Sequence, residues 1–296
     1  MNQVLIVMKK TKFELDIEKY QDLNYYKHIT KIQNNAFEKI FSSHIRQLES
    51  RKFLQEQVFP KGKFIFRDEL ENLNPQNFDL IVALGGDNHF TYVAHYVNEV
   101  PLLGCNSDEK TSIGALLGFT PQTLKQTILE NWVNTKIEQW SMIYGLLEYP
   151  NGKKTQTVSC VSEISIRNSS PDLTSRYILE YKGHIEEQKS SGLLLYTGAG
   201  STGWYASCVG LRDIEEESFP KNAPYFKVFS RELSRRARQN FKFTDFVVDT
   251  QIKVISEMYG GISIDCLPER IYDFPPGTVA FFQLSREKLK VITPQN

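Results

Sequence analysis

The stretch LIVALGGDNHF, Leu80–Phe90, decides the first half of the fold. Its first five residues are all apolar, which is typical of a strand buried on both faces of a parallel sheet. Residues 88–98 carry apolar side chains at helical spacing, and the glycine pair between the two segments permits a sharp turn. The stretch therefore predicts a buried strand, a tight turn and a helix that opens directly after the GGD sequence.

The residues on both sides of this stretch repeat the alternation of strand and helix. Apolar runs predict strands at residues 3–8, 61–67 and 101–106, and helical spacing predicts one or two helices in 22–57 and another at 121–131. Such alternation is typical of a parallel α/β sheet. Residues 1–132 are therefore expected to form an α/β domain.

The pattern changes after residue 132 to short strands separated by turn residues, with strand patterns again at 252–265 and 280–292. A β-rich second domain is expected from residue 133 onward. Within it, residues 203–240 look partly helical, and a solvated helix face explains the basic stretch at Ser234–Gln239.

The composition is that of an ordinary globular protein and limits the class of function. Lys+Arg and Asp+Glu number 35 each, so the basic excess typical of a nucleic-acid-binding protein is absent. No apolar run approaches the roughly 18 residues of a membrane-spanning helix. No two of the four cysteines have CxxC spacing, so no protein metal site is expected. These features favour a cytoplasmic protein that binds neither nucleic acid nor membrane.

Asp87 stands where ligands bind in parallel α/β sheets, at the end of a strand and the beginning of a helix. Gly85 and Gly86 would let the backbone approach such a ligand closely. Three roles are open for the carboxylate: a helix cap, a base that takes a proton from a substrate hydroxyl, or a metal ligand. The chain contains neither a GxxxxGK[ST] phosphate loop nor a GxGxxG fingerprint between strand and helix.

A second glycine-rich turn follows another apolar strand in LLLYTGAGSTGWYAS, Leu193–Ser207. Its small and hydroxyl-bearing residues are Thr197, Gly198, Gly200, Ser201 and Thr202. Their N–H and O–H groups could surround a ribose or a phosphate, or the segment could be only a tight strand-to-helix turn. Two such turns in one chain favour a nucleotide site.

Glu163 is an acid within an otherwise apolar, alternating strand, VSEISI at Val161–Ile166. Its simplest position is on the solvent face, but a position facing a cleft would let it bind ribose hydroxyls. His89 and His95 lie on the helix predicted after Asp87, where surface positions are expected.

The motifs, in their order along the chain, resemble those of the NAD kinase family. They are GGD at Gly85–Asp87, GCN at Gly104–Asn106, Ser162-Glu163 in place of an Asn-Glu pair, TGAGSTGW at Thr197–Trp204 and SID at Ser263–Asp265. The stretch EEQKSSGLLLYTGAGSTGWYAS, Glu186–Ser207, is similar to the mitochondrial-type branch, and so is KTKFELDIEKYQDL near the N-terminus. The similarity extends from residue 3 to about 292 and is weakest across 205–250.

The resemblance implies an α/β domain at 1–132, a β-rich NAD-binding domain at 133–275 and a C-terminal segment, 276–296, that packs back on the first domain. It implies transfer of the ATP γ-phosphoryl group to the 2′-hydroxyl of the adenosine ribose of NAD, giving NADP, with Asp87 as base and Mg²⁺ bound to ATP. It also implies a homodimer. The residues expected to bind the nucleotides are Gly85, Gly86, Asn88, Asn106, Ser162, Glu163, Ser191, Thr197, Gly198, Gly200, Ser201, Thr202 and Trp204.

Three positions differ from the commonest family pattern. Asn88 replaces the glycine that usually follows GGD, Ser162 replaces the usual asparagine, and Ser191 replaces an acid, as it does in the mitochondrial-type branch. Asn tolerates left-handed backbone better than most residues, so the turn could be kept. Two other functions therefore stand beside the NAD kinase: a non-catalytic NAD- or NADP-binding protein, and another GGD kinase that acts on a lipid or a sugar.

Overall fold

The computed structural model describes residues 3–34, 36–97, 99–210, 218–233 and 240–295. Its contacts divide the chain into two compact units: the first runs to Glu138 and resumes at Lys290, and the second is Gln139–Leu289. The basic stretch at Ser234–Gln239 lies outside the described residues.

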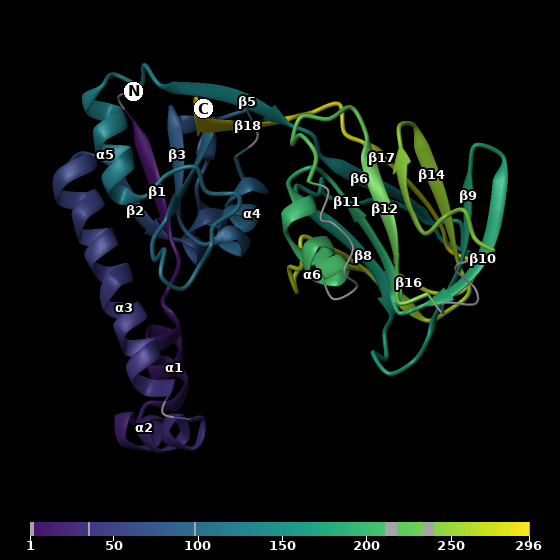
Figure 1. Cartoon of the computed structure of the whole chain (residues 1–296), viewed down its shortest axis with the longest axis horizontal. Coiled ribbons are helices and arrows are strands. Elements are labelled where there is room, and N and C mark those ends of the chain that lie inside the picture. Colours follow the sequence, from purple (N-terminus) through teal and green to yellow (C-terminus); the bar gives the residue numbers. More distant parts are fainter. Residues whose placement is uncertain (1–2, 35, 98, 211–217, 234–239, 296) are drawn as a thin grey trace. The chain divides into compact units, whose positions relative to one another are not determined.

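The first unit is built on a six-stranded sheet with the order β2-β1-β3-β4-β18-β5 (Figure 1). Its strands are β1 Val4–Met8, β2 Lys63–Phe66, β3 Leu80–Gly85, β4 Leu102–Asn106, β5 Thr135–Trp140 and β18 Leu289–Pro294. The pairings from β2 through β1, β3 and β4 to β18 are all parallel. The parallel sheet and the four strands expected in this part of the chain are confirmed. β3 is buried along its whole length, as its unbroken apolar run predicts.

The helices of the first unit are α1 Lys12–Tyr20, α2 Leu23–Ile32, α3 Ala36–Phe53, α4 Asp87–Ala94 and α5 Pro121–Leu129, with short helical turns at Leu54–Val58, Arg67–Asn72 and Pro75–Asn77. α2, α3 and α5 confirm the helices expected in 22–57 and at 121–131. α4 confirms the helix after the glycine pair but ends at Ala94. α1 begins at a capping box, in which Thr11 and Glu14 each accept a hydrogen bond from the other's backbone N–H.

The second unit contains two six-stranded sheets, β10-β9-β14-β17-β6-β7 and β13-β12-β11-β8-β15-β16, in which adjacent strands are antiparallel. Their strands are β6 Ile143–Glu148, β7 Lys154–Gln156, β8 Glu163–Asn168, β9 Ser175–Tyr181, β10 His184–Ser190, β11 Gly192–Tyr196, β12 Phe226–Arg231, β13 Asp245–Val248, β14 Gln251–Ser256, β15 Gly260–Ile264, β16 Ile271–Phe274 and β17 Val279–Leu284. Leu195 of one sheet and Val254 and Phe282 of the other belong to one buried cluster, so the sheets pack face to face.

Two segments differ in detail from the sequence-based expectations. Among its described residues, the partly helical region expected at 203–240 holds one short helix, α6 Trp204–Gly210, and then strand β12. β12 is paired with β11 on one side and β13 on the other, which is a strand environment. The last segment, 276–296, contains one strand of each unit, since β17 pairs with β14 and β6 whereas β18 pairs with β4.

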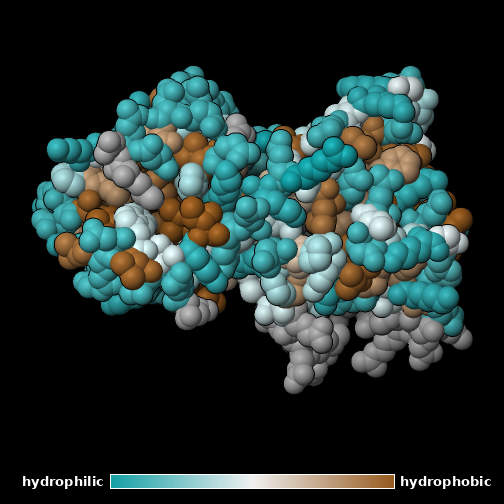
Figure 2. All heavy atoms as spheres, turned by 90° about the horizontal axis from the view of Figure 1, so that it is seen from above, coloured by the Kyte–Doolittle hydropathy of each residue, from teal (hydrophilic) through white to brown (hydrophobic). Residues whose placement is uncertain are grey.

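Figure 2 shows hydrophilic side chains over most of the visible face, with hydrophobic side chains in separate patches. No helix in the described part of the chain is long and apolar enough to cross a membrane. The four cysteines, all of them among the described residues, form no disulfide.

Candidate functional site

A cavity of about 350 Å³ opens in the first unit where β1, β3 and β4 end. The register pairs Met8 with Leu84, and Gly85 with Asn106, so the residues that follow these strands lie at one edge of the sheet. The cavity is lined by Lys9, Gln47, Gly85, Gly86, Asp87, Asn88, Asn106, Ser107, Asp108, Thr111 and Ser112. All five residues expected in this part of the nucleotide site therefore surround one space.

The Asp87 side chain is held by the loop that follows β4. Its two carboxylate oxygens accept hydrogen bonds from the backbone N–H groups of Ala115, at 3.1 Å, and Leu116, at 2.9 Å. Asp87 is the first residue of α4, and the N-cap is Gly86, which makes no side-chain hydrogen bond. The carboxylate is therefore not a helix cap, and each oxygen can still accept another hydrogen bond.

The residues on either side of Asp87 pack closely, and none of them has the left-handed backbone conformation. A Cβ on Gly85 would lie 2.7 Å from the His89 ring, and one on Gly86 would lie 3.2 Å from the Ser112 hydroxyl. Gly86 has a φ of −114°, which any residue can adopt. Asn88 is exposed and helical, so the left-handed conformation considered for it is not used. The turn therefore needs no glycine after Asp87.

His89 is buried under this turn, which corrects the surface position expected from the sequence. Its Nε2 lies 2.9 Å from the Val7 carbonyl, and its Nδ1 has no partner among the described residues. Burial, and after it the positive charges of Lys9 and Arg67, lower the pKa of His89 to about 4. The ring is therefore neutral at pH 7, with Nε2–H donating to Val7.

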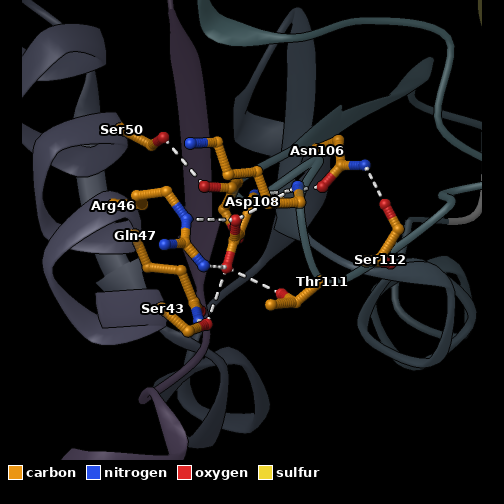
Figure 3. Close-up of polar contacts among 10 residues, drawn as sticks. Ser43, Arg46, Gln47, Ser50, Asn106, Asp108, Thr111 and Ser112 are labelled. Carbon is orange, nitrogen blue, oxygen red and sulfur yellow. Dashed lines mark hydrogen bonds and ion pairs between the residues drawn. The ribbon is translucent and has the colours of Figure 1, made fainter. Parts of the chain in front are cut away.

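The Asn106 side chain forms hydrogen bonds with the loop that lines the cavity. Its amide donates to the Ser112 carbonyl and its side-chain oxygen accepts from the Asp108 N–H, both at 3.0 Å (Figure 3). Gly114 has a φ of +69°, and a Cβ there would lie 2.7 Å from the Asn106 amide nitrogen. Asn106 therefore shapes the loop that carries the two N–H groups bound to Asp87.

Asp108 fastens the same loop to α3, and Figure 3 shows the side chains converging on it. Arg46 donates to both carboxylate oxygens, at 2.7 and 3.0 Å, and the hydroxyls of Ser43 and Thr111 donate at 2.6 Å. Burial alone would raise the pKa of Asp108, but these hydrogen bonds hold it at about 2. The loop is thus tied to a helix through an ionised carboxylate.

Glu163 lies in the second unit and is buried, which corrects the solvent-facing position expected by default. Ser162 Oγ donates to its carboxylate, and Cys266 Sγ donates at 3.4 Å. Burial raises the pKa of Glu163 to about 7, and the charge of Asp265 also raises it. The carboxyl group therefore changes its ionisation near neutral pH.

Asp265 orders the backbone around Glu163. Its carboxylate accepts from the N–H groups of Val161, at 2.9 Å, Ser162, at 2.7 Å, and Glu163, at 3.2 Å. Asp265 and Cys266 have φ values of 50° and 54°, an uncommon left-handed conformation for side-chain-bearing residues. Such strain is found at ligand sites, and here it brings two side chains next to Glu163.

The second glycine-rich turn is folded tightly on itself. The hydroxyls of Thr197, Ser201 and Thr202 all donate to backbone carbonyls, at 2.6, 2.7 and 3.4 Å. A Cβ on Gly198 or Gly200 would lie 2.3 Å from a backbone carbonyl oxygen. The turn is therefore a tight strand-to-helix connection that lies against the backbone preceding Glu163.

Ser191 and Trp204 line a separate cavity of about 520 Å³ in the second unit. The Arg231 guanidinium lies over the Trp204 ring, 4.6 Å from its centroid, and donates to the Ser191 carbonyl. Ser191 precedes β11, whereas Glu163 pairs with Tyr196 at the other end of that strand. The predicted second-unit residues therefore fall into two groups, one at each end of β11.

Lys9, Asp108 and Arg231 are among the residues of these sites that were not singled out from the sequence, and Asp265 was named there only as the end of the SID motif. Lys9 had a usable signal, because it directly follows the first predicted strand, as the turn of Asp87 follows the third. The roles of the other three depend on partners far away in the chain. Among the described residues, no group of three or more His, Cys, Asp or Glu side chains could hold a metal ion.

No protein-family model and no curated protein matches the sequence. Solved structures do match. An NAD kinase from Archaeoglobus fulgidus in complex with ATP has a TM-score of 0.60 and 18% identity, covering 99% of this chain and 94% of the other. A yeast NADH kinase complexed with NADH has a TM-score of 0.64 and 13% identity, covering 98% and 83%. The chain therefore has the mixed α/β fold of these NAD and NADH kinases.

Proposed function

We propose that the protein is an NAD kinase, which transfers the γ-phosphoryl group of ATP to the 2′-hydroxyl of the adenosine ribose of NAD and so makes NADP. The observation that carries this proposal is the Asp87 carboxylate, oriented by two N–H groups at a cavity formed by strand ends. The fold shared with kinases bound to ATP and to NADH supports both substrates. We further propose, from the resemblance of its motifs, that it belongs to the mitochondrial-type branch, and that it acts as a cytoplasmic homodimer.

In this reaction the ribose oxygen forms a bond to the γ-phosphorus while the bond from that phosphorus to the β,γ-bridging oxygen breaks, so that ADP leaves. Asp87 takes the proton of the attacking hydroxyl on a carboxylate oxygen. The N–H groups of Ala115 and Leu116 hold that carboxylate in one orientation. Mg²⁺ would come bound to ATP, since it keeps several waters and prefers substrate phosphates, and would neutralise phosphate charge.

The second unit would hold the dinucleotide. Glu163 can accept hydrogen bonds from ribose hydroxyls once its carboxyl group is ionised, which its pKa of about 7 allows at the pH of a cell. The glycine-rich turn lies against the backbone preceding it, and its backbone groups would lie close to such a ligand. Ser191 and Trp204 would contact another part of the same molecule.

The test is NADP formation from NAD, ATP and Mg²⁺, detected with an NADP-specific dehydrogenase. Wild-type protein is expected to form NADP. Asp87→Asn, which keeps the size of the side chain, is expected to lower kcat by about 10²–10⁴-fold, the usual contribution of a general base. Asp68→Asn removes an exposed acid of the same unit and should leave the rate unchanged.

One observation favours a second candidate, a non-catalytic NAD- or NADP-binding protein. Both oxygens of Asp87 are already bound by backbone N–H groups, which would give this residue a purely structural role. Folded wild-type protein that binds NAD but forms no phosphorylated product from NAD or NADH, with ATP or other donors, would establish this candidate and exclude the kinase.

A further inference from the structure

Lys9 brings a positive charge to the cavity beside Asp87. It directly follows β1, and because Met8 pairs with Leu84, Lys9 lies opposite Gly85 at the glycine turn. Adjacent parallel strands are about 4.8 Å apart, so the lysine backbone is next to that turn. The ammonium group therefore belongs to the same strand-end site as the proposed base.

A hydrogen bond fixes the backbone of Lys9, whereas its ammonium group makes no contact of this kind with the described residues. The Lys9 carbonyl accepts a hydrogen bond of 2.6 Å from Arg51, and Arg51 is itself held by Glu14 at 2.7 Å. The two nearby lysines pair with acids: Lys10 with Glu18, and Lys12 with an aspartate one helical turn ahead. The Lys9 ammonium has no hydrogen bond or ion pair with any residue that the structure describes.

Neither acid of the cavity forms an ion pair with Lys9. Asp87 accepts from two backbone N–H groups, and Asp108 is paired with Arg46. Burial lowers the pKa of Lys9, and the positive charge of Arg67 lowers it further. A partly buried ammonium without a partner is unfavourable, and a bound anion would remove that cost.

We propose that Lys9 binds the polyphosphate chain of the phosphate donor and neutralises charge on the phosphoryl group that is transferred. Lysine serves as a point charge for phosphates. Its position opposite Gly85 puts this charge and the Asp87 carboxylate on the same cavity. The identity of the donor rests on the proposed kinase activity, whereas the presence of an anion site does not.

The kinetic test compares Lys9→Ala and Lys9→Arg with wild type, and uses Lys10→Ala as the matched control. Lys9→Ala is expected to lower kcat/KM for ATP about 100-fold, as loss of one charge-stabilising group does, and to leave the KM for NAD unchanged. Lys9→Arg should recover much of the loss because the charge returns. Lys10→Ala should stay within about twofold of wild type, since it only breaks a surface pair.

A binding test separates this proposal from the proposed function. Inorganic tripolyphosphate is titrated into wild type, Lys9→Ala and Lys9→Met by calorimetry at two salt concentrations, with circular dichroism to show that each variant is folded. Binding that weakens at least tenfold in both variants supports the proposal, even if the wild type makes no NADP. Equal binding by wild type and the folded variants, or an unchanged kcat/KM for ATP in an active Lys9→Ala enzyme, overturns it.

Discussion

The raised pKa of Glu163 makes dinucleotide binding depend on pH near neutrality. If ribose hydroxyls donate to the ionised carboxylate, the KM for NAD should rise about eightfold between pH 7.5 and pH 6, for a pKa of about 7. Glu163→Gln should give a high KM for NAD that no longer varies over this range, with the KM for ATP unaffected. Steady-state kinetics at a series of pH values check this, and a pH dependence that survives in Glu163→Gln would refute it.

The ionisation of Glu163 that favours NAD binding as pH rises should lower the free energy of unfolding over the same range. The folded pKa of Glu163 lies above its ordinary value of 4.5, so the folded chain retains a proton that the unfolded chain has lost between about pH 4.5 and 7. The contribution of Glu163 to the free energy of unfolding is therefore full below this range and falls as pH rises through it. Urea denaturation should show that Glu163→Gln lacks this fall.

Individual buried positions were harder to predict than the segments that contain them. The alternation in VSEISI puts Glu163 on one face of its strand but does not say whether that face is covered. The second glycine-rich turn covers it, and this contact is made by residues more than thirty positions along the chain. For His89 a local signal existed, because Gly85, one helical turn earlier, has no side chain to occupy the space.

At the scale of elements, the loop after β4 carries the Ala115 and Leu116 N–H groups that hold Asp87, and Asp108 anchors it. Asp108→Ala should destabilise the protein by about 2 kcal/mol, because it leaves Arg46 and two hydroxyls without their charged partner. It should also lower kcat, since the proposed base loses its support. Urea denaturation at pH 7 and the NADP assay measure the two effects.

The Asp108 prediction has a pH signature and a control. Its pKa of about 2 lies below the ordinary 3.8, so its contribution to stability is present above pH 4 and is lost as pH falls toward 2. Glu18→Ala, which breaks an exposed pair with Lys10, should cost less than about 1 kcal/mol. An Asp108→Ala protein as stable and as active as the control would contradict the anchoring role.

Elements with a strong local pattern were predicted, and those defined by distant pairing were not. The strand that ends in the GGD turn, and the helix after it, follow from an unbroken apolar run and helical spacing. α1 was missed although Thr11 and Glu14 form a capping-box signature. β12 was placed in a partly helical region because its strand character depends on β11 and β13 on either side of it.

At the scale of the whole molecule, local patterns predict a parallel sheet but not its order. β18 is the last strand of the chain, yet it lies between β4 and β5 in the first sheet. No periodicity specifies that neighbour, since the pairing joins residues about 190 positions apart. The family resemblance led to the expectation that the C-terminal segment packs on the first domain. The buried residues of β18 show that this segment contributes to the stability of the first unit.

The position of β18 implies that the first unit is incomplete until residues 289–294 have been made. Ile292 is 3% exposed, pairs with Leu103 and belongs to the core beneath the first sheet. Ile292→Ala should cost about 2–5 kcal/mol through the cavity it leaves. Lys290→Ala on the same strand loses only a surface pair with Glu99 and should cost less than about 1 kcal/mol.

Hydrogen exchange can show where in the protein Ile292→Ala lowers stability, as well as by how much. In Ile292→Ala, the amides of β1, β3 and β4 should lose protection, because they share a sheet and a core with β18. The amides of β8 and β11, in the second unit, should keep theirs, because their core contains no residue of β18. Equal loss of protection in both sets of amides would contradict this prediction. It would mean that the two units unfold as one cooperative body, although each has its own core and the chain passes between them twice.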